Sequence, residues 1–417
     1  MKYAHLGDLH LGAWRDQKMR DLSTKAFLTA IDQCLQQQVD FILFAGDLFN
    51  TSLPSLDILK IVAKKLKELQ DQNVPLYTIA GSHDFSPSGK TMIDVLENAG
   101  LLKNVCKGKV HPETRELHLS FTIDPKTGTK ITGVLGRRGL LDKAYYEDLQ
   151  REALEQEPGY KIFMFHTTIT ELLPNHLPMI ESQPISVFPK HFQYYAGGHI
   201  HHPTKKEFEE YGVATYSGAL FPNNFQEVER YSHGGYYLIE VDNSSPKAQS
   251  QTVKWIPVKV MDHKAFTLDC TGKSPEVIAF DIATAFDNQN LQNTLITLRL
   301  EGTMQNGNVG DINFKEIFER LYRQGAYFVM KNTAKLQAEE FEEIKIAQTS
   351  PEEIEEAVLK EHLQQVPLFD LETERQLAKT LLITLNTTKN EGETSTDFQA
   401  RIESEMNRLL LPEAEKK

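Results

Sequence analysis

The sequence has few cysteines and no long hydrophobic run. The three cysteines among 417 residues are far apart and make neither a zinc-binding motif nor a disulfide framework. Cys34 lies on the apolar side of a predicted helix, so we expect it in the core. No apolar run approaches the length of a membrane span, and the start of the chain lacks the apolar core and cleavage site of a signal peptide. We therefore expect a cytoplasmic protein that does not associate with membranes.

Positive charge is also scarce. The chain has 45 Lys and Arg residues against 58 Asp and Glu residues, a formal net charge of −13. This balance argues against a protein that binds nucleic acid through bulk charge alone. It leaves room for a local basic face, or for binding through metal ions and a partner. A hydrophobic content of 40% with 25% charged residues is typical of a soluble globular chain.

Short apolar segments alternate with helical patterns over residues 1–260. The first predicted strands are 2–7, 41–45 and 74–80. The helices predicted to follow them are 23–38 with Ser23 as cap, 54–72 with Pro54 near its first turn, and 91–98. Further strands are predicted at 130–136, 160–165, 193–196, 213–217, 235–241 and 253–260, with a helix at 141–156. This order predicts an α/β fold built from layers of sheet and helix.

A turn at 243–246 precedes a change of pattern, and the length favours two or three domains. We predict domains at 1–260, 261–335 and 336–417. The second is a small α/β unit with a helix at 278–287, a strand at 294–300 and a helix at 314–323. The third is a helical tail, with a helix start at Ser350-Pro351, apolar stripes over 372–385 and 398–409, and a polar linker at 386–396.

Side chains that can bind metals stand where the predicted strands end. They are Asp8, His10, Asp47, Ser82, His83, His166, His199 and His201. Ligands bind beyond the carboxyl ends of strands in open α/β sheets, so these side chains should converge. Asp47 follows a strand predicted to be buried on both faces, and its two carboxylate oxygens can bridge two cations.

The set combines imidazole and carboxylate without thiolate, which suits manganese, iron or zinc. Two such cations can clamp a phosphate, generate hydroxide and stabilise a leaving oxygen. Any one of these histidines alone is more often structural than metal-bound, and that interpretation is kept for the other histidines. The ordered set is a much stronger signal than any single member.

The ordered motifs resemble those of a known family. Asp8-Leu9-His10, Gly46-Asp47, Gly81-Ser82-His83-Asp84, His166 and Gly198-His199-Ile200-His201 resemble the five motifs of calcineurin-like metallophosphoesterases. Asp8-Leu9-His10-Leu11-Gly12, Gly46-Asp47-Leu48-Phe49 and the helical tail resemble the archaeal nuclease subunit of the SbcCD-type DNA double-strand-break repair complex. The resemblance implies a layered β-sandwich flanked by helices, a small α/β capping domain and a helical C-terminal tail.

The resemblance also implies a role for each motif residue. One metal would be held by Asp8, His10, Asp47 and His201. The other would be held by Asp47, Ser82, His166 and His199, and both metals would be manganese. His83 would face the scissile phosphate and protonate or stabilise the leaving oxygen, and Asp84 would orient His83.

Two positions depart from the family pattern. Ser82 stands where asparagine is usual, and a hydroxyl is a shorter and weaker ligand than an amide carbonyl, so we expect the second metal to bind more loosely. Asn50 stands where many members have histidine; it can hydrogen-bond a phosphate but cannot take up a proton. The balance of exonuclease and endonuclease activity therefore stays open. Arg15 is a candidate phosphate contact or, with Lys90, Arg137, Arg138, Lys205 and Lys206, part of a solvated rim.

The function that the resemblance implies is a manganese-dependent DNA nuclease that processes DNA ends in double-strand-break repair. It would act as a 3′-5′ exonuclease and as a single-strand or hairpin endonuclease. The partners would be DNA, a second copy of the chain and an ABC/SMC-type ATPase repair subunit. Helix 54–72, which is apolar on more than one side, and the helix near 92–96 would form the dimer contact, and the C-terminal helices would bind the ATPase.

Other interpretations stay open at this stage. Helix 54–72 could be covered within the monomer, and the tail helices could pack back on the small domain. The same di-metal site would also serve a phosphatase or a cyclic-nucleotide phosphodiesterase, although a minimal phosphatase lacks the added domain and tail. With Ser82 altered, a weakly catalytic DNA-end scaffold for the ATPase is the remaining alternative.

Overall fold

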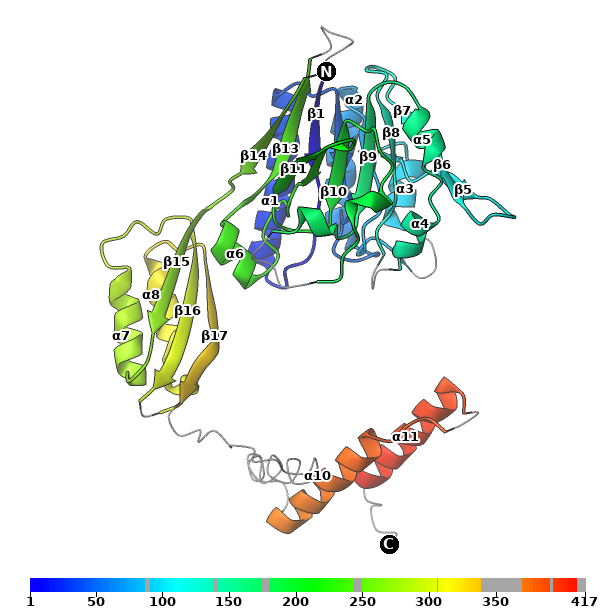
Figure 1. The fold of residues 1–417 in the computed structure, drawn as a ribbon. Helices are drawn as coiled ribbons and strands as arrows, with labels where there is room; N and C mark the ends of the chain where they lie inside the picture. Colours follow the sequence, from blue (N-terminus) through cyan, green and yellow to red (C-terminus); the bar gives the residue numbers. More distant parts are fainter. Residues whose placement is uncertain are drawn as a thin grey trace. The chain divides into compact units, whose positions relative to one another are not determined.

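The computed structural model describes residues 1–86, 91–137, 141–174, 180–242, 250–305, 307–338, 370–390 and 393–410. The chain divides into two compact units, Met1–Glu340 and Phe341–Lys417, which are taken in turn below. The elements follow the colours from blue to red in Figure 1.

A six-stranded mixed sheet starts the first unit, in the order β14-β13-β1-β2-β3-β4. Its strands are β1 (Lys2–Leu6), β2 (Phe41–Phe44), β3 (Leu76–Thr78), β4 (Lys103–Asn104), β13 (Gly234–Val241) and β14 (Gln251–Val258). The strands from β1 to β4 pair in parallel, whereas β13 and β14 add antiparallel strands beside β1. The parallel strands therefore end at one edge of the sheet.

A second six-stranded sheet has the order β11-β12-β10-β9-β8-β7. Its strands are β7 (Thr122–Ile123), β8 (Lys130–Gly133), β9 (Lys161–His166), β10 (Tyr194–Gly198), β11 (Thr204–Phe208) and β12 (Gly212–Tyr216). A hairpin of β5 (Gly108–Val110) and β6 (Leu117–Leu119) stands apart from it. One buried cluster joins Tyr3 and Phe41 of the first sheet to Ile162 and Tyr194 of the second, so the two sheets form the predicted sandwich.

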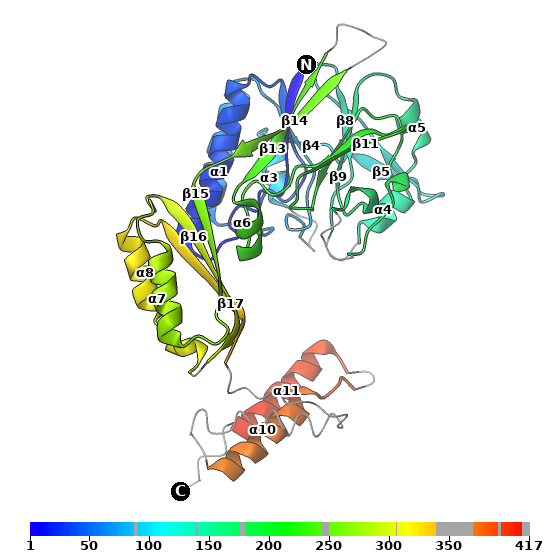
Figure 2. The ribbon, with the colours of Figure 1, turned by 60° about the vertical axis from the view of Figure 1, so that its left-hand side comes forward.

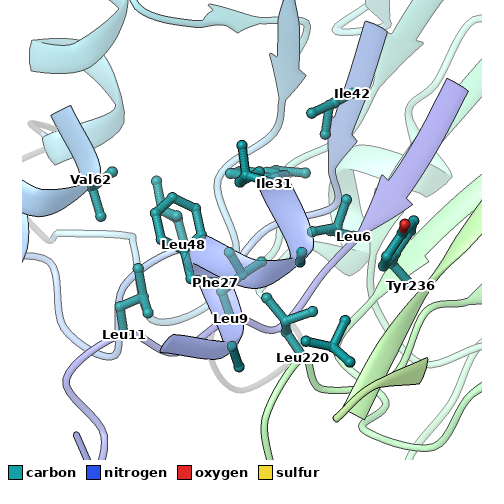
Figure 3. Close-up of a cluster of buried hydrophobic side chains, with 14 of the residues drawn as sticks. Leu6, Leu9, Leu11, Phe27, Ile31, Ile42, Leu48, Val62, Leu220 and Tyr236 are labelled. Atoms are coloured by element: carbon teal, nitrogen blue, oxygen red, sulfur yellow. The ribbon is translucent and has the colours of Figure 1, made fainter. Parts of the chain in front are cut away.

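Helices cover the outer face of the first sheet. They are α1 (Gln17–Gln36), α2 (Leu56–Asp71) and α3 (Met92–Asn98). Figure 3 shows part of the resulting cluster, with Phe27 and Ile31 of α1 gathered with Leu6 and Ile42 of the sheet. Cys34 is buried in α1, as predicted.

Two predicted helix starts need correction. The cap of α1 lies seven residues earlier than predicted, about two turns of helix, because the carboxylate of Asp16 accepts hydrogen bonds from the first-turn N–H groups of Lys18 and Met19. Ser23 is therefore buried inside the helix and is not its cap. α2 begins at Leu56 with Ser55 as its cap, so Pro54 precedes the helix.

The single helix predicted at 141–156 is wrong. The segment forms two short helices, α4 (Lys143–Glu147) and α5 (Glu152–Gln156). Between them, Leu149 makes a bridge to Leu117, and the N–H of Leu117 donates to the Asp148 carbonyl at 2.7 Å. This long-range pairing interrupts the helical pattern.

A three-stranded parallel sheet with its own core completes the first unit. It consists of β15 (Asp262–Asp269), β16 (Thr294–Met304) and β17 (Phe328–Ala338), with α7 (Pro275–Ala285) and α8 (Phe314–Arg323) packed on it (Figure 2). The outer strands β15 and β17 are additions to the predicted pattern. The division at residue 260 stays a prediction, although the new sheet does begin at Asp262.

The second unit contains α10 (Leu371–Leu385) and α11 (Ser395–Leu410), which pack against each other. These helices agree with the two predicted apolar stripes, but α11 begins inside the predicted linker at 386–396. The turn at 243–246 and the helix start at Ser350-Pro351 lie outside the described residues. Within the described ranges, no helix combines the length and the hydropathy needed to cross a membrane.

Candidate metal centre

The loops that follow β1 and β2 hold potential ligands on an unusual backbone. Asp8, His10 and Asp47 have φ angles of 49°, 42° and 52°, in the left-handed region that side chains other than glycine rarely adopt. Two hydrogen bonds fix these loops together, from the N–H of Asp8 to the Gly46 carbonyl at 3.2 Å and from that of His10 to the Asp47 carbonyl at 2.9 Å. Backbone strain persists where the surrounding structure imposes it, commonly at functional sites.

Asp47 lies at the middle of the group of potential ligands. Its Oδ2 is 3.2 Å from Nε2 of His166 and 3.5 Å from Nε2 of His10, and its Oδ1 accepts a hydrogen bond from the His83 N–H at 2.7 Å. These partners come from three different strand ends. Gly81 permits the close approach, since a Cβ there would lie 2.3 Å from Oδ1 of Asp47.

Asp8, His10 and His201 form one side of the centre. The Nε2 atoms of His10 and His201 are 3.1 Å apart. The buried carboxylate of Asp8 accepts hydrogen bonds from the backbone N–H of His199, at 2.8 and 3.0 Å. The segment Gly198–His201 therefore contributes to the centre through its backbone as well as through its side chains.

Three overlapping sets of side chains place their ligand atoms within 4.8 Å of one another. They are Asp8, His10 and His201; His10, Asp47 and His83; and Asp8, Asp47 and His166. Because the sets share members, they form one continuous centre built from residues up to about two hundred positions apart.

The chemistry of this donor set fits a pair of divalent cations. Metal–nitrogen bonds of about 2.0–2.1 Å place two imidazole nitrogens on one ion roughly 3 Å apart, which is the observed separation of the His10 and His201 nitrogens. Nε2 of His166 is buried, faces Asp47 and has no hydrogen bond of acceptable geometry. A bound ion is one explanation for a buried polar atom without such a bond, and the site therefore fits a cation at this position.

Burial and charge shift the pKa values of these groups in opposite directions. Burial lowers the pKa of His10 to about 3. Burial also disfavours the charged form of His166, but Asp47 and Asp8 outweigh it and raise the pKa of His166 to about 10. His166 and His10 in turn hold the pKa of Asp47 below its usual range against the effect of burial. Asp47 thus keeps a negative charge that a cation can balance in place of a proton.

The remaining two predicted ligands are Ser82 and His199. Ser82 is buried, and its Oγ is 3.5 Å from Oδ2 of Asp47. The His199 side chain is exposed, and its ring centroid lies 5.3 Å from that of His166. Neither belongs to the three sets above, and their roles as ligands stay predictions.

The ring of His83 is held by the main chain. Its Nδ1 is 2.8 Å from the carbonyl oxygen of Asn50, which can only accept, so Nδ1 donates this hydrogen bond. The ring lies 4.7 Å from that of His10, centroid to centroid. The main chain of Asn50 thus orients His83, whereas the side chain of Asn50 was the part predicted to bind phosphate.

Asp84 has hydrogen bonds different from those expected of a residue that orients His83. Its two carboxylate oxygens accept from the backbone N–H groups of Leu48, Phe49 and Gly81, at 3.2, 3.1 and 3.0 Å. Burial, followed by the charge of Asp47, raises the pKa of Asp84 to about 7. Asp84 therefore fastens the loop after β2 to the loop after β3, and its role in orienting His83 stays a prediction.

Glu227 is a supporting residue that the sequence motifs do not include. It lies on α6 (Phe225–Tyr231), and its Oε1 is 3.0 Å from Nδ1 of His201. A carboxylate behind a metal-binding histidine fixes the tautomer and raises the basicity of the ring. The available signal was the spacing Asn224-x-x-Glu227, in which Asn224 caps α6 and accepts from the Glu227 N–H at 2.9 Å.

Some of the basic residues near the centre are exposed, and some donate hydrogen bonds within the protein. Arg15 is exposed in the loop before α1, and its role as a phosphate contact stays a prediction. The ammonium group of Lys205 donates to the Val253 carbonyl at 3.2 Å, and Arg137 donates to the Tyr145 hydroxyl at 3.1 Å. Lys90 and Arg138 lie outside the described residues.

Comparison with known proteins agrees with this geometry. The family model of the calcineurin-like phosphoesterases matches residues 1–203, which contain all the predicted metal ligands. Residues 1–203 therefore carry a calcineurin-like metallophosphoesterase domain, and the imidazoles and carboxylates gathered in it are of the kind that binds divalent metals.

Among characterised proteins, the chain is similar to the DNA double-strand break repair protein Mre11 of two archaea. It is 28% identical to that of Methanopyrus kandleri over 254 residues and to that of Methanococcus maripaludis over 256 residues. These alignments cover 58% and 57% of this chain, but only 54% and 62% of the relatives, so the chain spans little more than half of their length. It is also 26% identical over 215 residues to the uncharacterised metallophosphoesterase YhaO of Bacillus subtilis, covering 51% of this chain and 48% of that protein.

Proposed function

We propose that the protein is a manganese-dependent DNA nuclease that processes DNA ends in double-strand-break repair. The observation that carries the proposal is the convergence of carboxylates and imidazoles on Asp47 in a domain similar to archaeal Mre11. The activities proposed are 3′-5′ exonuclease and single-strand or hairpin endonuclease cleavage.

The ligands in this proposal follow the predicted division. The first cation would be held by Asp8, His10, Asp47 and His201. The second would be held by Asp47, Ser82, His166 and His199. When bound, such a pair supplies the positive charge that polarises a phosphodiester and activates water.

The other residues have roles in positioning and proton transfer. As the imidazolium, His83 would give its Nε2 proton to the leaving oxygen and keep the Nδ1 proton, which the Asn50 carbonyl holds. Asp84 keeps the loops that carry Asp47 and His83 in register. Glu227 fixes the His201 ring in the orientation that its Nε2 needs.

Turnover on different phosphate esters tests this function. Purified protein with manganese should cleave a DNA hairpin and single-stranded ends, and should leave cyclic nucleotides and phosphate monoesters largely intact. Faster turnover of a monoester or a cyclic nucleotide would favour the phosphatase or cyclic-nucleotide phosphodiesterase alternative. DNA binding without turnover on any ester would favour the weakly catalytic scaffold.

We also propose that the protein acts as a homodimer through α2 and α3. Leu56 on α2 is 81% exposed and Val95 on α3 is 54% exposed, although both helices are packed on the core along their other faces. Apolar side chains left exposed on these two helices are available for a protein contact. Sedimentation at micromolar concentration should give a dimer that Leu56→Glu dissociates, and a monomeric wild type would contradict the proposal.

The third proposed partner is an ABC/SMC-type ATPase repair subunit that binds the C-terminal helices. Leu371, Ile383 and Leu385 on α10 remain exposed although α10 packs on α11. Deletion of residues 350–417 should abolish binding to the ATPase and spare manganese-dependent hydrolysis of small phosphodiesters. Loss of both would indicate that the tail is structural.

A further inference from the structure

A small cavity adjoins the metal centre and has no role in the account above. Its volume is about 260 Å³, and its wall includes His201, Arg230, Tyr231, His233 and Trp255. His201 is also one of the predicted metal ligands, so the cavity and the metal centre share a side chain. The other four residues lie at the end of α6 and on or just before β13 and β14.

Aromatic rings form much of this wall. The indole Nε1 of Trp255 donates to the Ser217 carbonyl at 3.1 Å, which fixes the plane of the ring. The His233 ring lies 6.2 Å from that of Trp255, tilted by 36°. A preformed aromatic surface can stack on any nucleobase, because every base has a π-face.

Arg230 supplies an uncompensated positive charge. The two acidic residues of α6 are already paired, Glu227 with His201 and Glu229 with Arg299, whose Nε is 3.0 Å from Oε2 of Glu229. Arg230 is exposed, and none of the ion pairs in the described part of the chain involves it. An exposed guanidinium that has no acidic partner is suited to bind a phosphate or to stack on a base.

We propose that this cavity is a subsite for one unpaired nucleobase of the DNA strand whose phosphodiester lies in the metal centre. Trp255 and His233 would stack on the base, and Arg230 would bind an adjoining phosphate. The inference rests on the proposed nuclease function. A cavity of this volume has room for a single base taken out of its stack, so we expect a preference for unpaired strands beside the cleaved bond.

The binding test uses tryptophan fluorescence in EDTA, which separates base binding from metal chemistry. Single-stranded oligothymidylate should quench Trp255, whereas deoxyribose 5-phosphate and inorganic phosphate should not. Trp255→Leu should abolish the quenching, and the remaining Trp14 emission reports that the variant is folded. Equal quenching of the variant, or equal quenching by deoxyribose phosphate, would overturn the subsite. Binding of free dAMP as tightly as the oligonucleotide would assign the cavity to mononucleotides instead.

The second test compares cleavage of an intact oligonucleotide with one that is abasic beside the scissile bond. Wild type with manganese should show a KM about tenfold lower for the intact strand. Trp255→Leu should reduce this discrimination to near unity, whereas Arg323→Ala, at an exposed arginine on α8, should keep it. Arg230→Ala should raise KM for both strands, because both keep the phosphate. Discrimination that survives Trp255→Leu contradicts the proposal. A wild type that binds oligothymidylate but cleaves neither strand would contradict the nuclease function and leave the subsite intact.

Discussion

The two sides of the metal centre differ in how their side chains are held. On the side of His10 and His201, the partly buried carboxylate of Glu227 supports His201, and the two imidazole nitrogens are 3.1 Å apart. On the other side, His166 is anchored by the Ala45 carbonyl at 2.8 Å, but Ser82 offers only a hydroxyl and the His199 side chain is exposed. The comparison teaches that the residues behind the ligands, as well as the ligands themselves, determine how firmly each cation is bound.

The largest effect expected from a variant that keeps all seven predicted metal ligands concerns His83. His83→Gln should reduce turnover of single-stranded DNA by roughly 10²–10⁴-fold, because it removes the proton donor for the leaving oxygen. Manganese stoichiometry should stay as in wild type, which calorimetry can measure. Unchanged turnover would remove His83 from the reaction.

Glu227→Gln should selectively weaken manganese binding on the side of His10 and His201. The amide keeps the shape but loses the charge behind His201, so we expect manganese affinity at one position to fall about 10–100-fold. Glu229→Gln is the matched control, since this neighbour on the same helix pairs with Arg299 and not with a metal ligand. Equal losses in the two variants would mean that α6 acts only as scaffold.

The weaker side should be strengthened by Ser82→Asn. An amide carbonyl reaches further than the hydroxyl, so the second manganese should bind several-fold more tightly and the two affinities should approach each other. Titration of metal followed by activity and by calorimetry measures both. Identical affinities in wild type and variant would show that Ser82 does not limit the second position.

A smaller effect is expected from pH. The carboxylates raise the pKa of His166 to about 10, so the metal-free centre holds a proton at neutral pH that a cation must displace. Manganese affinity should therefore rise with pH between about pH 6 and 8, by at most about tenfold per unit for one proton. Calorimetry in buffers of different ionisation enthalpy should detect protons released on binding, and a pH-independent affinity would contradict this assignment.

Most of the fold could be predicted from the sequence, and so could the convergence of five of the seven predicted ligands, because both depend on local patterns. Apolar runs such as 41–45 identify buried strands, and the residue after each run identifies a strand end. Two contacts between residues far apart in the chain could not be predicted, because no local pattern in the sequence marks them. The bridge between Leu149 and Leu117 splits a helix that looks continuous, and Glu227 meets His201 only after folding. The capping signal that places Glu227 on α6 says nothing of the histidine that its carboxylate faces.

The central claim is that this centre binds two cations bridged by Asp47. The direct test is manganese bound per chain, measured by elemental analysis after equilibrium dialysis, in wild type and in Asp47→Ala. The account predicts two per wild-type chain and at most one in the variant, with DNA cleavage lost in the variant. Active wild-type protein with no stoichiometric transition metal would contradict it.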